Sequence, residues 1–539
     1  MEQYNIILAA GYVREPIRFL PFNGSFNPIC GKPAIHWILS AIKDFDKTII
    51  AVSENDVSLL KYLDCLYPAI KIVKMNKQST ICQSLFKCLN NIKNDSRVEL
   101  IFSDTFVSEI ETTSKENVFY TSSNIFDSKT WAIVECDRFG YIKKFYDKKN
   151  IQIRKNRKAL IGYFKFSSSM ALKKCFCNLN IKITNSIVPV LQKYCARFKV
   201  DSVDTDKWLD FGHIRGSAEA RRNFISKQTR EFNSLSLKSE MGVIEKCSAN
   251  ILKLKGEYIW YKSLPPALKV ISPRVLSYEE KDGYASLAME LYGYHSLSEC
   301  WVYGTSGFEE WARIIECIFK IQEKLRSYKM PKGVNVDLKE IYLEKTKARL
   351  RQLKNTGLSS ALDEPVIFIN GKAYRNLPLL KNNLFHLIKK ELLESKDFSI
   401  THGDLCFSNI LFDPNYYIFK LIDPRGSFGD IGIYGDPRYD IAKLRHSIVG
   451  MYDFMVAGFF DLRQQANNNF SFKINSINSA ITLEKYFDLC VEKFAYKLSE
   501  IKLIEALLFL TMIPLHSESL PRQKAFYLTA IKKLNEVIN

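Results

Sequence analysis

The sequence predicts an α/β protein that is built from more than one domain. Its 539 residues exceed what one compact core usually holds, because single domains typically contain about 100 to 200 residues. Short apolar segments alternate with helical patterns in the N-terminal part, which predicts an open, mostly parallel sheet. After a polar stretch at 221–240 the pattern changes to strands followed by long helices. We therefore expect domains at 1–225, 226–300 and 301–539.

The N-terminal domain is predicted from five elements. We expect strands at 4–10, 48–52 and 99–102 and helices at 33–42 and 80–89. The first strand is an apolar run that ends at Gly11, and the third leads into Ser103 and Asp104. Because ligands of parallel sheets bind at the carboxyl ends of the strands, we expect a site beside these two ends.

The C-terminal part is predicted to begin with strands and to continue as a helical unit. We expect strands at 242–246 and 285–291 and helices at 309–328 and 338–353. This order indicates a small sheet followed by a mainly helical unit.

Composition limits the class of protein. Hydrophobic residues make up 47% and charged residues 25%, which is typical of folded globular chains. The chain contains 77 Lys and Arg residues and 58 Asp and Glu residues, so its net charge is +19, which suits anionic partners such as nucleotides. The thirteen cysteines form no C-x-x-C pair, which indicates reduced thiols and a cytoplasmic protein.

The sequence predicts neither a signal peptide nor a membrane span. No basic segment precedes the first apolar run, and Gly11 interrupts that run. Another apolar stretch, 506–513, is far shorter than the ~20 residues that cross a bilayer. The sequence leaves open whether the protein contacts a membrane surface peripherally.

The strongest chemical signal is the segment from His402 to Asn409, followed by Asp423 at the end of the next strand. Phosphoryl transfer needs a carboxylate beside the attacking hydroxyl and oxygen ligands that hold magnesium on the nucleotide phosphates. We assign Asp404 as the group that accepts the hydroxyl proton, and Asn409 and Asp423 as ligands of Mg²⁺. A single Asp or Asn in a loop usually caps a turn, but three at this spacing favour catalysis.

This segment resembles the aminoglycoside phosphotransferase and choline kinase family, relatives of the protein kinases. The stretch Gly435-Asp-Pro-Arg-Tyr-Asp440-Ile-Ala resembles the family's G-D-P-x-x-D-x-A motif. The resemblance implies a two-lobed kinase-like α+β fold over about 226–539, with ATP as phosphate donor. It also implies that Asp440 supports the catalytic loop and that Asp436 lies behind it.

A kinase of this kind needs a strand lysine that reaches the phosphates and a glutamate that fixes the lysine. Lys246 lies on a predicted strand, and Glu257 opens a predicted helix, so we expect these two to pair. Lys253 and Lys255 are alternative candidates for the lysine.

The remaining nucleotide contacts are expected on either side of this pair. No G-x-G-x-x-G precedes the strand, and the stretch 230–235 stands in its place, with Asn233 and Ser234 as candidate phosphate contacts. Glu290, in Met-Glu-Leu followed by Gly293, resembles the hinge that binds adenine through backbone groups.

Arg425 follows the expected metal ligand Asp423 by two residues. A guanidinium at this place can hold a transferred or acceptor phosphate. The alternative is a loop arginine that pairs with Asp430 or Asp436, and the sequence does not choose between the two.

The N-terminal part resembles the sugar-phosphate nucleotidyltransferases, which implies a Rossmann-like fold. Residues 8–14 resemble the start of their L-A-A-G-x-G-x-R pattern, residues 31–33 their G-K-P pattern, and residues 208–212 their W-x-D-x-G segment. The resemblance implies nucleotide contacts at Ala9, Ala10, Gly11, Arg14 and Lys32, metal ligands at Asp104 and Asp210, and a phosphate contact at Lys148.

This part also departs from the family pattern. Val13 replaces the second glycine of the loop, and Gly24 stands where the family has a lysine. Arg14, Arg18 or Lys32 could supply the missing charge. A nucleotidyltransferase fold that only binds a ligand is therefore an alternative to an active transferase.

A basic run between Lys143 and Lys158 could attract nucleic acid or anionic lipid. Such runs are more often a solvated face, and no nucleic-acid-binding module accompanies this one. The sequence thus argues against a nucleic-acid partner.

Together the two resemblances imply a bifunctional enzyme. A kinase turns a hydroxyl into a phosphomonoester, and a nucleotidyltransferase uses such a phosphate as its nucleophile. We expect a small hydroxyl-bearing substrate, ATP, Mg²⁺ and a second nucleoside triphosphate, with CTP as our first choice, in the synthesis of a bacterial surface polysaccharide. An active kinase with an inactive N-terminal module is the alternative. The sequence indicates no oligomeric state.

Overall fold

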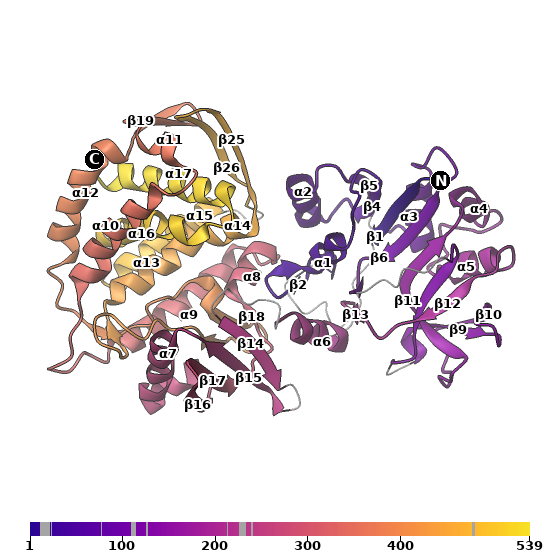
Figure 1. Cartoon of the computed structure of the whole chain (residues 1–539), viewed down its shortest axis with the longest axis horizontal. Helices are drawn as coiled ribbons and strands as arrows, with labels where there is room; N and C mark the ends of the chain where they lie inside the picture. Colours follow the sequence, from indigo (N-terminus) through magenta and orange to yellow (C-terminus); the bar gives the residue numbers. More distant parts are fainter. Residues whose placement is uncertain are drawn as a thin grey trace. The chain divides into compact units, whose positions relative to one another are not determined.

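The chain folds into two compact units, Met1–Phe224 and Ile225–Asn539, which are coloured along the sequence in Figure 1. The computed structural model describes residues 1–10, 22, 24–76, 78–108, 115–125, 128–212, 214–225, 233–238, 241–476 and 480–538. The division between the units falls inside the polar stretch at 221–240. Each unit has its own sheet and its own helices.

The first unit is built on a nine-stranded mixed sheet. Its strands are β1 (Gln3–Ala9), β4 (Thr48–Ser53), β5 (Lys71–Met75), β6 (Arg97–Phe102), β8 (Val118–Ser122), β9 (Ala132–Cys136), β10 (Ile142–Asp147), β11 (Arg157–Phe166) and β12 (Asp201–Asp204). Strands β6, β1, β4 and β5 pair in parallel, whereas β11 pairs antiparallel with β6, β8 and β9. The predicted α/β class with a parallel core is confirmed.

Short strands and helices complete this unit. They are β2 (Pro28–Ile29), β3 (Lys32–Pro33), β7 (Thr105–Val107), β13 (Trp208–Asp210), α1 (Ala34–Ser40), α2 (Val57–Leu66), α3 (Ile81–Leu89), α4 (Ser169–Lys174), α5 (Val188–Cys195) and α6 (Ile214–Ile225). Helix α3 begins where the sequence predicts it, because Thr80 and Gln83 form a capping box at its start.

The core of this unit lies on both sides of β1. Ile6 and Leu8 join one buried cluster with Leu85 of α3 and Leu191 of α5. Ile7 is also fully buried, and alternate residues of a strand face opposite sides of the sheet. A strand buried on both faces explains the unbroken apolar run at the start of the sequence.

The second unit begins with a four-stranded antiparallel sheet in the order β14, β15, β17, β16. These strands are Asn233–Lys238, Val243–Ser248, Tyr284–Glu290 and Val275–Lys281, and helix α7 (Ile251–Ser263) connects β15 to the rest. Figure 1 shows α7 beside this small sheet. This arrangement is the smaller lobe of a two-lobed fold.

The larger lobe is mainly helical. Its helices are α8 (Leu297–Tyr303), α9 (Phe308–Arg326), α10 (Lys345–Leu353), α11 (Ser359–Leu362), α12 (Leu377–Leu392), α13 (Pro437–Ile448), α14 (Tyr452–Ala457), α15 (Ala480–Lys493), α16 (Leu498–Met512) and α17 (Leu520–Val537). Its short strands are β18 (His295–Ser296), β19 (Val366–Ile369), β20 (Lys372–Arg375), β21 (Ser399–Ile400), β22 (Ile410–Asp413), β23 (Ile418–Leu421), β24 (Tyr434–Gly435), β25 (Phe460–Ala466) and β26 (Asn469–Ile474). No helix in the described ranges is long and apolar enough to cross a bilayer.

Helix α13 is the centre of the larger lobe, and each of its residues is buried. It packs against α16, which in turn packs against α17 (Figure 1). Several of its buried side chains are charged, so each needs a partner to offset the loss of solvation. Arg445, for example, binds the carboxylates of Asp488 and Glu505.

Two predicted helices differ from those observed. The stretch 338–353 is a π-helix (Lys339–Glu344) that continues as α10. The helix that carries Glu257 begins at Ile251 rather than beside Glu257, because the side chain of Asn250 accepts the Lys253 N–H and caps it there.

Helix α7 contacts the loop after β23 through two glycines. A Cβ atom on Gly426 would lie 2.2 Å from the carbonyl carbon of Gly256, and Gly426 has a φ of +72°. Only glycine adopts this φ at low cost, and only glycine leaves room for the helix backbone. The pair therefore fixes α7 against the loop that follows Asp423.

We predict that Gly426→Ala destabilises the second unit by roughly 2 to 4 kcal/mol, because a clash with backbone adds to the cost of the left-handed conformation. Gly283→Ala is the matched control, since Gly283 has a φ of +81° but open space around its Cα. Calorimetry should show a clearly larger drop in the unfolding temperature for Gly426→Ala. Equal drops would contradict the close contact.

Candidate active sites

The loop between β21 and β22 places Asp404 between two polar partners. Lys443 Nζ of α13 lies 2.7 Å from Asp404 Oδ1. The Asn409 amide donates to Asp404 Oδ2 at 3.2 Å and to its carbonyl oxygen at 2.8 Å. Burial acts to raise the pKa of Asp404, but the charge and hydrogen bond of Lys443, together with His402 and Arg425, outweigh it and hold the pKa well below its ordinary value. Asp404 is therefore ionised and held in one orientation, with 42% of its side chain exposed.

The backbone of this loop is held by Asp440, which is fully buried near the start of α13. Its two oxygens accept the N–H groups of His402 at 2.8 Å and Gly403 at 2.7 Å. Burial raises the pKa of Asp440 to about 7. Burial also lowers the pKa of His402 to about 4, so its ring is neutral, and Nε2 lies 3.0 Å from the Ile422 carbonyl. Both side chains thus shape the loop.

Lys246 of β15, in the smaller lobe, binds Asp423 in the loop that follows β23. Its Nζ lies 2.6 Å from Glu257 Oε2 and 2.5 Å from Asp423 Oδ1. Burial acts to lower the pKa of Lys246, but the charges of Asp423 and Glu257 outweigh it and raise the pKa. The structure thus brings together the predicted lysine and glutamate, while the alternative Lys255 pairs with Glu280.

The oxygens of Asn409 and Asp423 are suited to a hard cation. Burial acts to raise the pKa of Asp423, but the charge and hydrogen bond of Lys246, together with the charge of Lys253, outweigh it and lower the pKa, so the carboxylate is ionised. Its side chain is 53% exposed. Asn409 directs its amide N–H to Asp404, which leaves its carbonyl oxygen with a 3.4 Å contact to the Ser408 hydroxyl. This donor set fits Mg²⁺ with further ligands from phosphates.

The other predicted nucleotide contacts lie on strands. Ser234 is exposed on β14, opposite Cys247 of β15, so it is on a strand and not in the predicted loop. Asn233 is the first residue of the same strand. Glu290 ends β17, and its carboxylate accepts the Tyr292 hydroxyl at 2.8 Å.

Arg425 does not form the ion pair that was one of its two predicted alternatives. Within the described residues neither Asp430 nor Asp436 lies within 4.0 Å of its guanidinium, and Asp436 binds Arg438. The Arg425 guanidinium instead lies 5.2 Å from the centre of the Phe428 ring and 5.6 Å from that of Tyr439.

Three residues of this region were not predicted. Lys443 could have been found, because it follows Asp440 by three positions and a helix places such residues on one side. Tyr439 lies four positions before Lys443, and its hydroxyl is 3.3 Å from Lys345 Nζ. No local pattern marks Lys345, which comes from the start of α10.

In the first unit the two predicted metal ligands lie beside the same glycine. Strands β7 and β13 pair, with Thr105 opposite Asp210. The Gly212 N–H donates to Asp210 Oδ1 at 2.8 Å. A Cβ atom on Gly212 would lie 2.6 Å from Asp104 Oδ2. Two carboxylates far apart in the sequence therefore adjoin one backbone position, which is a donor set that fits a divalent cation.

The expected nucleotide contacts of this unit are only partly described. Ala9 ends β1 with Ala10 next to it, and Lys32 lies on β3 just before α1. Gly11 and Arg14, with Arg18, fall outside the described residues.

Lys148 is exposed just after β10. Its N–H donates to the Trp131 carbonyl at 3.1 Å, and the Trp131 ring packs on Trp208 of β13. The backbone at Lys148 is thus linked through two rings to the strand that carries Asp210.

The basic run is partly neutralised by acids. Salt bridges join Arg157 to Glu135, Lys158 to Asp204 and Lys143 to Asp137. Part of the run therefore has local acidic partners.

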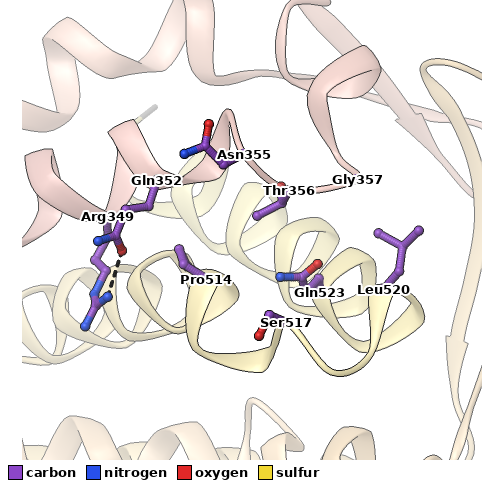
Figure 2. A pocket seen from close by; sticks show the side chains of 9 residues that line it. All are labelled: Arg349, Gln352, Asn355, Thr356, Gly357, Pro514, Ser517, Leu520 and Gln523. Carbon is purple, nitrogen blue, oxygen red and sulfur yellow. Dashed lines mark hydrogen bonds between the residues drawn. The ribbon is translucent and has the colours of Figure 1, made fainter.

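A cavity of about 550 Å³ lies at the C-terminal end of α10 (Figure 2). It is lined by Arg349, Gln352, Asn355, Thr356, Gly357, Pro514, Ser517, Leu520 and Gln523. These side chains include no carboxylate, and none of them belongs to the two candidate sites. The cavity therefore adds nothing to the chemistry above.

Solved structures of two kinds are similar to this chain. A UDP-glucose pyrophosphorylase in complex with UDP-glucose is 16% identical, with a TM-score of 0.36, over 42% of this chain and 100% of that one. A thermostable aminoglycoside phosphotransferase variant in complex with AMP-PNP and hygromycin B is 12% identical, with a TM-score of 0.37, over 58% of this chain and 91% of that one. An aminoglycoside-3'-phosphotransferase of type VIII is 15% identical, with a TM-score of 0.30, over 50% and 84% of the two chains. The likeness concerns the fold. No protein-family model and no curated protein matches the sequence.

We predict that Asp440→Asn destabilises the larger lobe by about 1 to 3 kcal/mol, since an amide has one acceptor oxygen and leaves a buried N–H without a partner. Asp282→Asn is the control, because Asp282 lies in an exposed turn. Thermal unfolding of both variants checks the expectation. Equal stability of Asp440→Asn and the unsubstituted chain would show that the two N–H bonds contribute little.

Proposed function

We propose that the chain is a bifunctional enzyme. The second unit, with a nucleotide lobe at 226–300 and a helical lobe at 301–539, phosphorylates a hydroxyl of a small metabolite with ATP. The first unit, at 1–225, couples the phosphorylated product to a nucleotide. The observation that carries the proposal is that Asn409 binds Asp404 through its side chain and accepts, with its backbone carbonyl, the N–H of Ile422, the residue before Asp423, while Lys246 binds Asp423.

In the kinase step Asp404 accepts the proton of the acceptor hydroxyl. The hydroxyl oxygen forms a bond to the γ-phosphorus of ATP, the bond from that phosphorus to the bridging oxygen breaks, and ADP leaves. Lys246, held by Glu257, supplies positive charge beside the phosphates. Mg²⁺ bound by Asn409 and Asp423 would neutralise phosphate charge.

In the transferase step an oxygen of the phosphorylated product attacks the α-phosphorus of a second nucleoside triphosphate, and pyrophosphate leaves. Asp104 and Asp210 would hold Mg²⁺ there and reduce the repulsion between the two phosphates. Lys148 would contact the phosphate of the incoming product. Ala9, Ala10 and Lys32, with Gly11 and Arg14, would contact the nucleotide.

The role that we propose for the product is that of an activated building block for a bacterial surface polysaccharide, made in the cytoplasm, with CTP as the first nucleotide to test. The alternative is an active kinase with an inactive N-terminal module. Val13 and Gly24 support it, since a missing cation beside the triphosphate could cost several kcal/mol in the transition state. Pyrophosphate release with phosphorylated acceptors and each of the four triphosphates separates the two.

We predict that Asp404→Asn lowers the acceptor-dependent production of ADP by at least about 100-fold, because the hydroxyl loses its proton acceptor. Pyrophosphate release from a supplied phosphorylated acceptor should be unchanged, so the same chain provides the control. Full kinase activity of Asp404→Asn would refute the role assigned to this carboxylate.

Asp210→Asn should have the opposite effect. We expect pyrophosphate release to fall by at least about 100-fold, since the metal loses a charged ligand, while ADP production stays unchanged. Loss of both activities in this variant would indicate damage to folding. An unchanged rate of pyrophosphate release would contradict the metal site.

A further inference from the structure

Three cations gather on one side of the proposed catalytic carboxylate. We define the cationic cluster as Lys345, Arg425 and Lys443. Lys443 binds Asp404 at 2.7 Å, and Lys345 Nζ lies 3.3 Å from the hydroxyl of Tyr439. Lys345 Nζ and the Arg425 guanidinium lie 5.7 Å and 5.6 Å from the centre of the Tyr439 ring. Three separate elements, α10, α13 and the loop after Asp423, therefore bring positive charge to one place.

The positive charge of this cluster exceeds its negative charge. Across the described parts of the chain, Lys345 and Arg425 have no carboxylate within 4.0 Å, and Asp404 is the partner of Lys443. The nearby Asp436 is taken by Arg438, at 2.7 Å. Lys345 and Arg425 thus remain without a carboxylate partner. They belong to the same cluster as Lys443, which binds Asp404, the group that is to receive the hydroxyl proton.

The surroundings of Tyr439 show the strength of this field. Burial acts to raise the pKa of Tyr439, but Lys345, Arg425 and Lys443 outweigh it and lower the pKa to about 8. Tyr439 in turn acts to raise the pKa of Lys345, yet burial and the other two cations outweigh it and lower the pKa. Cations that repel one another and are partly desolvated are costly, and a bound anion would offset that cost.

The position of Lys345 separates this cluster from the nucleotide site. Lys246, Glu257 and Asp423 form the charged group of the smaller lobe. Lys345 belongs to the helical lobe and contacts α13. Its charge therefore adjoins the helix whose Lys443 binds Asp404, and not the strand that carries Lys246.

We propose that the cationic cluster binds an anionic group of the phosphoryl acceptor. The acceptor of the kinase unit is then a hydroxyl compound that carries a carboxylate or a phosphate, such as a hydroxy acid or a sugar phosphate. A positively charged acceptor, such as an amino sugar or a quaternary ammonium alcohol, is repelled at the same place. This inference depends on the proposed kinase function and defines its substrate class.

Matched acceptor pairs test the inference with the full chain. Glycerate is compared with glycerol, gluconate with glucose, glucose 6-phosphate with glucose, and choline represents the cationic class. ADP production and the mass of the product are measured, together with binding by calorimetry in the presence of AMP-PNP and Mg²⁺. We expect at least one acid to exceed its neutral partner by roughly tenfold or more in kcat/KM or in affinity. The carboxylate and phosphate pairs show which anion is preferred.

Lys345→Gln provides the residue-level test. The KM or Kd for the preferred acid should rise by about tenfold, while the KM for ATP stays within about twofold, and the preference for acid over alcohol should decrease. Lys345→Arg should restore part of the affinity, because it keeps the charge. Lys354→Gln, an exposed lysine at the end of α10, is the matched control and should behave as the unsubstituted chain.

Each outcome decides one of the two proposals. If a neutral or cationic acceptor is turned over at least as well as the matched acid, and the turnover depends on Asp404, the proposal of an anionic acceptor is wrong. The proposed kinase function is then unaffected. Absence of acid binding across the panel, or binding that Lys345→Gln does not weaken, also overturns the anionic acceptor. Acceptor-stimulated ADP production that is equal in Asp404→Asn overturns the kinase assignment itself.

Discussion

The organisation of the larger lobe depends on two hydrogen bonds to one buried carboxylate. Asp440 accepts the backbone N–H groups of His402 and Gly403 and so ties the catalytic loop to helix α13. The same helix carries Lys443, which binds Asp404. One fully buried helix therefore sets the backbone of the loop and the charge of its central side chain together. A shift of α13 would change both at once.

The sequence allowed much of this arrangement to be predicted. The apolar run of β1 and the capping box of α3 are local signals, so these elements lie close to where they were expected. The pairing of Lys246 with Glu257 was also expected, because a strand lysine and a helix glutamate are required together by phosphoryl transfer. The pairing of β7 with β13 brings Asp104 and Asp210 to the same glycine. The family resemblance implied that these two carboxylates, which are far apart in the sequence, belong to one metal site.

Other features depend on contacts that no local pattern records. Lys345 reaches Tyr439 from a helix almost a hundred residues earlier in the chain, and nothing in its own segment marks it. The stretch with Ser234 was expected as a loop because it stands in the place of the family's glycine-rich loop, but its pairing with β15 makes it an edge strand. For Arg425 the sequence left a phosphate contact and a pairing with Asp430 or Asp436 open; Asp436 binds Arg438 instead, and the Arg425 guanidinium lies beside the Phe428 ring. Competition between side chains decided these positions.

The contact between α7 and the loop after Asp423 has a consequence for how this protein can evolve. The atom that a side chain at position 426 would strike belongs to the main chain of Gly256, which every amino acid possesses. A larger residue at position 426 therefore cannot be accommodated by a substitution at position 256, since glycine is already the smallest choice. It requires that helix α7 moves or that the contact between α7 and the loop is lost.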